Sequence, residues 1–157
     1  MKPCTEPSVQ AYTRLVRSSE ALHAFVSRGL AARGITASQF SAMKVLRIHG
    51  KLAQRDIAKF TLKTGGNITV IVDNMESTGL VTRDRDTKDR RVTYVRLTPE
   101  GEAVFDHLYP LHLDRIREAM SAFSEAECEL LIELLEKLSP EQTEIACAPP
   151  APLASLK

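Results

Sequence analysis

The chain has 157 residues, of which 43% are hydrophobic and 26% are charged, and its formal net charge is +1 at pH 7. This is enough apolar material for one globular domain with helical extensions, and no apolar run approaches the roughly 20 residues that a membrane-spanning helix needs. No apolar segment follows Met1–Cys4, so we expect no signal peptide, and three widely spaced cysteines favour a reducing, cytoplasmic setting over a disulfide framework.

The charges are distributed unevenly along the chain. Up to Arg91 there are sixteen Lys and Arg against eight Asp and Glu, whereas from Thr98 onward there are four against twelve. A basic front and an acidic rear indicate a molecule whose front faces a polyanion. For the rear, simple solvation of a C-terminal helix pair is a sufficient explanation.

Helical patterns dominate the first half. Apolar residues at helical spacing predict a long helix over 8–33, which Gly34 ends. Thr36–Gln39 reads as a capping box that opens a second helix, and Gly50 ends it. The sequence around Leu52 is expected to be only a short connection.

Two shorter helices follow, over 54–60 and 65–77. A turn at 62–64 separates them, and Gly79 is expected to end the second one. At about 100° per residue, one face of the 65–77 helix is apolar and must be buried. Its members are Ile68, Ile71, Val72 and Met75.

A hairpin is predicted over 80–97, because β-branched and aromatic flanks surround a charged tip. Thr98-Pro99 then gives an N-cap and a first-turn proline for a long helix, with a bend expected at Pro110. A second capping box, Ser124–Glu127, opens the last helix, whose leucines form an apolar stripe. Beyond 140, a Pro-rich tail over 141–157 is expected to be disordered.

This order predicts a mainly α fold with a small β-hairpin wing, that is, a winged helix-turn-helix over 36–97. Segments 1–35 and 98–140 would be long dimerisation helices, because they carry more apolar surface than so small a core can cover. A monomeric bundle is the alternative. Helix 65–77 would present Asn, Thr and Val side chains to base edges, although Asn67 could instead cap the helix and Val70 could contact a neighbouring helix.

One segment resembles a known family. Residues 89–101, DRRVTYVRLTPEG, fit the pattern D-x-R-x-x-x-V-x-L-T-x-x-G, which is the wing signature of the MarR (multiple antibiotic resistance regulator) family of transcription factors. Residues 66–81 are also similar to that family's recognition helix and its exit. The resemblance covers 36–101 by motif and the whole chain by helix order.

The resemblance implies a homodimeric regulator, usually a repressor, that binds a pseudo-palindromic double-stranded DNA operator. Its recognition helix 65–77 would enter the major groove, with these residues nearest the bases: Thr64, Gly66, Asn67, Thr69 and Val70. Its wing, 83–92, would enter the minor groove with Arg85, Lys88, Asp89, Arg90 and Arg91, the Asp89 carboxylate steadying Arg91. Phosphate contacts are expected from Gln54, Arg55 and Lys63. Val70 departs from the basic residue that many members carry there, so the wing would supply a larger share of affinity.

The resemblance also implies release from DNA by a small phenolic or lipophilic anion bound between the dimer helices and the winged part. A redox sensor is an alternative, but the first long helix contains no cysteine, and an inert Cys128 is expected. No metal or cofactor is predicted, because His107 and His112 lie about 140° apart on their helix. No catalytic motif supports an enzyme. A winged module that binds a protein partner is the remaining alternative.

Overall fold

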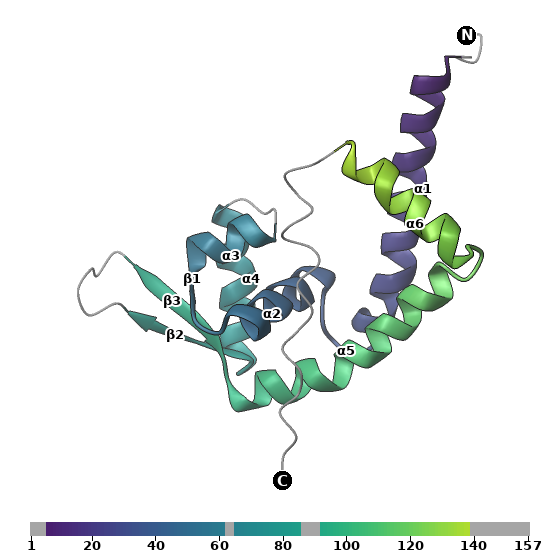
Figure 1. Cartoon of the computed structure of the whole chain (residues 1–157). Coiled ribbons are helices and arrows are strands. Elements are labelled where there is room, and N and C mark those ends of the chain that lie inside the picture. Colours follow the sequence, from purple (N-terminus) through teal and green to yellow (C-terminus); the bar gives the residue numbers. More distant parts are fainter. Residues whose placement is uncertain (1–5, 62–64, 86–91, 139–157) are drawn as a thin grey trace.

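The computed structural model describes residues 6–61, 65–85 and 92–138 of the chain (Figure 1). Within them the elements run in the predicted order of four helices, a hairpin and two helices. Their bounds are α1 (Pro7–Ala31), α2 (Ala37–His49), β1 (Leu52–Ala53), α3 (Gln54–Phe60), α4 (Gly65–Ser77), β2 (Val81–Arg85), β3 (Thr93–Leu97), α5 (Pro99–Ala119) and α6 (Glu125–Glu136). The fold is therefore predominantly helical with a small antiparallel sheet, as expected. The predicted tail, 141–157, lies outside the described residues.

The helix boundaries follow the capping signals. The hydroxyl oxygen of Thr36 accepts a hydrogen bond from the Gln39 backbone N–H, and the Gln39 side chain accepts one from the Thr36 N–H. Ser124 and Glu127 form the same reciprocal pair at α6. These hydrogen bonds lower the pKa of the Glu127 carboxyl, the backbone N–H of Ser124 contributing most. Both predicted capping boxes are confirmed.

The sheet has three strands in the order β1-β3-β2, all antiparallel. The hairpin β2–β3 pairs Val81 with Leu97 and continues to Arg85 opposite Thr93. The expectation of a plain connection around Leu52 was wrong: Leu52 pairs with Val95 and so adds a third strand. Two residues are too short to show an alternating pattern, and their strand character depends on a partner more than 40 residues away.

The core joins the winged part to α5. The ring of Phe40 in α2 stacks on that of Phe105 in α5, with centroids 5.3 Å apart. The apolar face of α4 packs into the same cluster, and Val95 of β3 is fully buried there. Burial of this continuous cluster is the main source of stability for the winged part.

A close junction connects the end of α4, the hairpin and the start of α5. Thr98 caps α5, and its hydroxyl donates a 2.6 Å hydrogen bond to the carbonyl of Gly79. Gly79 has φ +75°, which ends α4 as predicted. A Cβ on Gly101 would lie 2.0 Å from the Leu80 carbonyl oxygen, so only glycine fits. This geometry accounts for the Thr and Gly of the T-x-x-G motif.

The long helices extend beyond this core. Helix α1 packs against α5, while its N-terminal half projects away from the winged part (Figure 1). Helix α5 runs continuously through Pro110 and changes direction along its length. No residue of α6 is buried in the single chain. Among the described residues, no helix has both the length and the apolarity to cross a membrane.

Candidate nucleic-acid interface and ligand pocket

Helix α4 has a buried face and an exposed face, as its sequence predicts. Ile68, Val72 and Met75 are at most 1% exposed, and Ile71 is also buried. On the other side Gly66, Asn67 and Thr69 are exposed, and Val70 is 57% exposed. Val70 therefore does not pack into a neighbouring helix, which removes the alternative considered for it. Thr64 lies outside the described residues.

Helix α3 brings two of the predicted phosphate contacts beside α4. Arg55 is exposed, 4.0 Å from the Asp56 carboxylate. The Gln54 side chain is half-buried and donates a 2.7 Å hydrogen bond from Nε2 to the hydroxyl of Thr69. The Gln54 amide therefore already bonds within the protein, and its contact with a phosphate stays a prediction. Lys63 lies outside the described residues.

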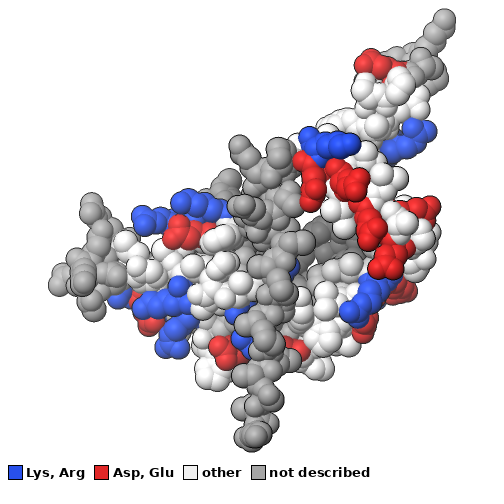
Figure 2. Space-filling view, viewed as in Figure 1, with Lys and Arg blue, Asp and Glu red and all other residues white. Residues whose placement is uncertain are grey.

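The hairpin carries the predicted wing. Arg85 is exposed and is the last residue of β2, so it stands at the root of the tip. The other predicted wing residues, Lys88, Asp89, Arg90 and Arg91, lie outside the described residues. The pairing of Asp89 with Arg91 therefore stays a prediction. Figure 2 shows Lys and Arg gathered beside the hairpin and α3, whereas Asp and Glu follow α6.

Arg83 of β2 makes polar contacts with both α3 and α4, and the sequence patterns assigned it no role. Its guanidinium donates to Asp73 at 2.6 Å and to Glu76 at 2.5 Å, both on α4. It also reaches the Gln54 side-chain oxygen at 3.4 Å. Burial lowers the pKa of Arg83, but the hydrogen bonds to Glu76 and Asp73 outweigh it, so the pKa is raised. An arginine within a strand gives no sign of such partners before the helix is placed against it.

The other ion pairs of the hairpin lie nearer the surface. Arg96 of β3 donates to the Asp84 carboxylate at 3.1 Å. The Lys51 ammonium lies 3.7 Å from the same carboxylate and 4.8 Å from the centre of the Tyr94 ring. Exposed pairs of this kind contribute little to stability, typically about 0–1 kcal/mol. They add positive charge to the hairpin without contacting α4.

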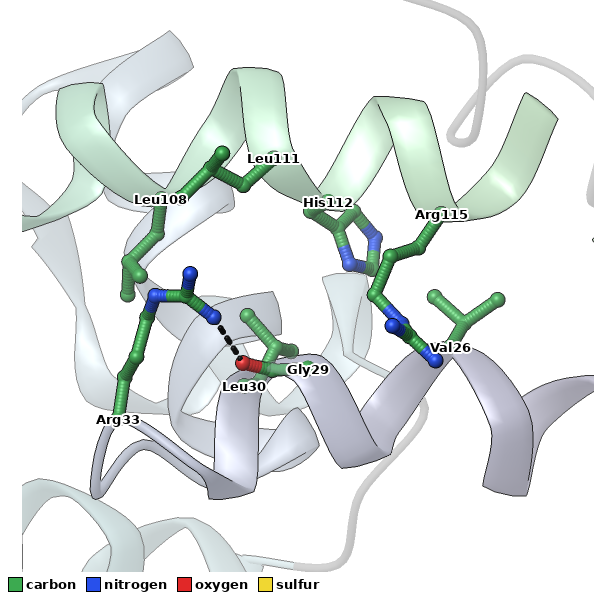
Figure 3. Close-up of a pocket in the computed structure, with 8 residues that line it drawn as sticks. All are labelled: Val26, Gly29, Leu30, Arg33, Leu108, Leu111, His112 and Arg115. Atoms are coloured by element: carbon green, nitrogen blue, oxygen red, sulfur yellow. Dashed lines mark hydrogen bonds between the residues drawn. The ribbon is translucent and has the colours of Figure 1, made fainter. Parts of the chain in front are cut away.

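A small pocket lies between α1 and α5 (Figure 3). Its cavity is about 10 Å³, which is room for roughly one water. His112 and Arg115 reach across from α5, and Arg33, in the turn after α1, closes one side by donating a 2.8 Å hydrogen bond to the Gly29 carbonyl. The remaining lining residues are Val26, Gly29, Leu30, Leu108 and Leu111.

The pocket contains polar atoms without partners. Nδ1 of His112 and Nε of Arg115 are buried and make no hydrogen bond. The Arg115 guanidinium lies 4.5 Å from the Phe25 ring and donates to the Phe25 carbonyl. Burial, together with the positive charge of Lys44, lowers the pKa of His112. Nε of Arg115 is a donor, whereas Nδ1 of a neutral imidazole donates or accepts according to its tautomer, so the pocket offers one unpaired cationic donor to an acceptor.

Other candidate chemistry is sparse in the part of the chain that the structure describes. It contains no group of three or more His, Cys, Asp or Glu side chains arranged to hold a metal ion. His107 is exposed, whereas His112 faces α1 and contacts Phe40, with ring centroids 4.5 Å apart and planes tilted by 48°. Cys128 is half-buried in α6 and forms no disulfide. Cys4 and Cys147 lie outside the described residues.

Relatives of known class resemble this chain over most of its length. The HTH-type transcriptional regulator YkoM of Bacillus subtilis is 30% identical over 132 residues, covering 84% of this chain and 86% of YkoM. The HTH-type transcriptional regulator MhqR of the same organism is 28% identical over 134 residues, covering 85% and 92%. Residues 35–93 match the MarR family.

Solved structures agree with these relatives. BpsR of Bordetella bronchiseptica, whose DNA binding is regulated by 6-hydroxynicotinic acid, superposes with a TM-score of 0.77 at 25% identity, covering 83% of this chain and 98% of BpsR. A mutant of MarR from E. coli in complex with operator DNA has the same fold, with a TM-score of 0.77 at 24% identity and coverage of 85% and 96%. The chain thus belongs to the MarR family of transcriptional regulators, which are not enzymes.

Proposed function

We propose that this chain acts as a homodimeric repressor of a pseudo-palindromic operator. Helix α4 would enter the major groove and the hairpin tip the adjacent minor groove. The observation that carries the proposal is the exposed polar surface of the first half of α4, with Gly66, Asn67, Thr69 and Val70, on a helix that packs against the hairpin carrying Arg85. Two such units in a dimer would meet successive half-sites about 10 base pairs apart.

The apolar surface of the long helices supports the dimer. Large apolar side chains that are at least 37% exposed in the single chain lie along α1 and α6. Their gathering on two helices distinguishes them from the scattered apolar residues that any protein surface carries. They include Val9, Tyr12, Leu15, Leu22, Leu130, Ile132, Leu134, Leu135 and Leu138. A second copy of the chain covers such stripes by two-fold symmetry.

For the major groove we assign the exposed residues of α4 to base edges. The Asn67 amide can pair with adenine, and the methyl groups of Thr69 and Val70 can meet a thymine methyl. Gly66 lies in the first turn of α4, where backbone N–H groups face a phosphate readily, and Thr64, which precedes the helix in the sequence, is assigned to the same contact. The helix contains no Lys or Arg, so its contribution would be mainly to specificity.

Affinity would come mainly from the basic residues around α4. Arg85, Lys88, Arg90 and Arg91 form the wing set, with Asp89 as the partner that orients Arg91. The narrow minor groove concentrates negative potential, which favours an inserted arginine. Arg55, Lys63 and the Gln54 side chain are assigned to backbone phosphates.

We further assign the α1–α5 pocket to a small organic anion that releases the DNA. The unpaired Nδ1 of His112 and Nε of Arg115, with the guanidinium of Arg33, suit a carboxylate or phenolate. Leu108 and Leu111 would contact an aromatic ring. The closed cavity is too small for such a ligand, so Arg33 would have to release the Gly29 carbonyl. Regulation of BpsR by 6-hydroxynicotinic acid gives a precedent for this ligand class.

The test is selection of binding sites from a randomised pool of duplexes by the full chain. We expect a palindromic consensus and an affinity that falls steeply as salt rises. Sedimentation should give two chains per duplex. Failure to retain any duplex at low salt would overturn the proposal and favour the protein-binding alternative.

A further inference from the structure

Arg83 joins three elements that separately approach the proposed interface. It belongs to β2 and lies opposite Val95 of β3, so its backbone is fixed within the sheet. Its side chain is only 20% exposed and contacts two carboxylates of α4. In addition, the Arg83 backbone N–H donates a 3.2 Å hydrogen bond to the Glu76 side chain. The backbone and the side chain of Arg83 therefore both form hydrogen bonds with α4.

The two carboxylates restrain how α4 is rotated about its axis. Asp73 and Glu76 are three residues apart and so lie on one face of the helix. A planar guanidinium that bonds both in different directions allows only a narrow range of helix orientations. Arg83 donates to Asp73 through Nη2 and to Glu76 through Nη1, so a rotation of α4 that changes one contact also changes the other. The hairpin and α4 are thereby held at a fixed angle.

A second path leads from Arg83 to a residue on the exposed face. The Gln54 side-chain oxygen accepts from Nε and Nη2 of Arg83, and its amide nitrogen donates to the hydroxyl oxygen of Thr69. The contact with Arg83 thus orients the Gln54 amide so that its nitrogen, and not its oxygen, faces Thr69 of α4. The hydroxyl oxygen of Thr69 is thereby held as the acceptor of the Gln54 amide. Thr69 lies one helical turn before Asp73, on the same side of α4.

We propose that Arg83 is a positioning residue for sequence recognition. It sets the angle between hairpin and α4 and, through Gln54, the orientation of the Thr69 hydroxyl. All three guanidinium nitrogens have acceptors within the protein, so Arg83 acts without itself contacting DNA. This inference rests on the proposed DNA binding. It assigns discrimination between sequences to a residue within β2 that is not one of the predicted wing contacts.

The test compares two duplexes of equal length and composition, the best one selected by the wild-type chain and a scrambled one. For Arg83→Met we expect the ratio of their dissociation constants to fall by about tenfold or more, the size of one lost base contact. Binding to the scrambled duplex should weaken only slightly, through the loss of one positive charge, and the salt slope should stay unchanged, since Arg83 makes no phosphate contact. Arg96→Met is the matched control, because Arg96 is in the same hairpin but pairs with Asp84. Its ratio should stay at the wild-type value.

A second variant keeps the arginine and removes its acceptors. In the pair Asp73→Asn and Glu76→Gln, two negative charges beside the proposed interface disappear, so binding to the scrambled duplex should strengthen. The specificity ratio should nevertheless fall as in Arg83→Met. This variant also serves if Arg83→Met is shown by circular dichroism to be unfolded. The two variants change the net charge in opposite directions, so a specificity ratio that falls in both reports the lost contact between Arg83 and α4 and not the change of charge.

Three results would overturn the inference. One is an unchanged ratio in a folded Arg83→Met or in the acceptor variant. Another is an equal loss on both duplexes with a salt slope lower by about one, which would make Arg83 a phosphate contact. A wild-type chain that selects no sequence would remove the proposed function itself, and this is distinguishable because it appears before any variant is made.

Discussion

Arg47 of α2 holds Asp106 of α5 through two parallel hydrogen bonds of 3.1 and 3.3 Å. The hydrogen bond to Asp106 raises the pKa of Arg47 although burial opposes it. This bidentate pair joins the same two helices, α2 and α5, as the stacked rings of Phe40 and Phe105. It therefore reinforces the contact between the winged part and the long helix.

The pair gives a stability prediction. A double-mutant cycle with Arg47→Met and Asp106→Asn should yield a coupling free energy of about 0.5–1 kcal/mol, since both groups are partly solvated. The matched control is the exposed pair Arg117–Asp114 within α5, 2.7 Å apart, whose coupling should be smaller. Urea unfolding measures both. Equal coupling free energies in the two cycles would show that an ion pair between two helices stabilises the fold no more than one within a helix.

Gly101 gives a packing prediction. Gly101→Ala places a Cβ 2.0 Å from the backbone carbonyl of Leu80, so α5 or the turn must shift. We expect a loss of about 2–3 kcal/mol in the free energy of unfolding, as for overpacked cores. At Gly66 of α4 an added Cβ meets nothing within 4 Å. Gly66→Ala should therefore be neutral or stabilising, by up to about 1 kcal/mol. A tolerated Gly101→Ala would refute the close approach.

His112 gives a pH prediction. Its pKa is lowered in the folded chain by burial and by Lys44, so the unfolded chain binds more protons in the window below about 6.5. Stability should thus fall as pH drops through that value and level off below the folded pKa. His112→Phe, which keeps a ring against Phe40, should flatten this part of the profile. His107→Phe, at an exposed position on the same helix, should leave the slope as in the wild type.

Arg91 gives a binding prediction for the hairpin tip. Arg91→Ala should weaken binding to the selected duplex by about tenfold or more, the size of a lost groove contact. The salt slope should also fall by about one if the guanidinium displaces a counterion. Fluorescence anisotropy at several salt concentrations measures both, with Arg96→Ala as the control on the same hairpin. Unchanged affinity would remove Arg91 from the interface.

Helix α6 gives an assembly prediction. Leu134→Glu places a charge within the exposed apolar stripe and should shift the chain toward monomer, because burying an unpaired carboxylate is costly. Glu133→Gln, at the adjacent exposed position, should leave assembly unchanged. Sedimentation velocity at micromolar concentration distinguishes the two. A Leu134→Glu chain that sediments like the wild type would place the interface elsewhere.

Local signals in the sequence predicted most of the fold. The capping boxes at Thr36 and Ser124 satisfy backbone groups within four residues, so their geometry needs no distant partner. The inward face of α4 was equally accessible, since helical periodicity alone separates Ile68 and Met75 from the exposed residues.

Features that depend on distant partners were not predicted. Leu52 becomes a strand only because Val95 pairs with it. No sequence pattern singled out Arg83, because its contacts with Asp73 and Gln54 exist only once three elements meet. Asp73 is exposed, and its carboxylate nevertheless pairs with Arg83 of β2. The wing tip at 86–91 was predicted from its motif, and its contacts remain to be tested by the Arg91 variant.

The bond between Thr98 and Gly79 has one more consequence. Because this hydrogen bond joins the residue after β3 to the end of α4, the protein itself fixes the distance between α4 and the hairpin. A half-site lengthened by a single base pair between the two grooves could not be accommodated by stretching this joint. Such a duplex would be held at one groove only.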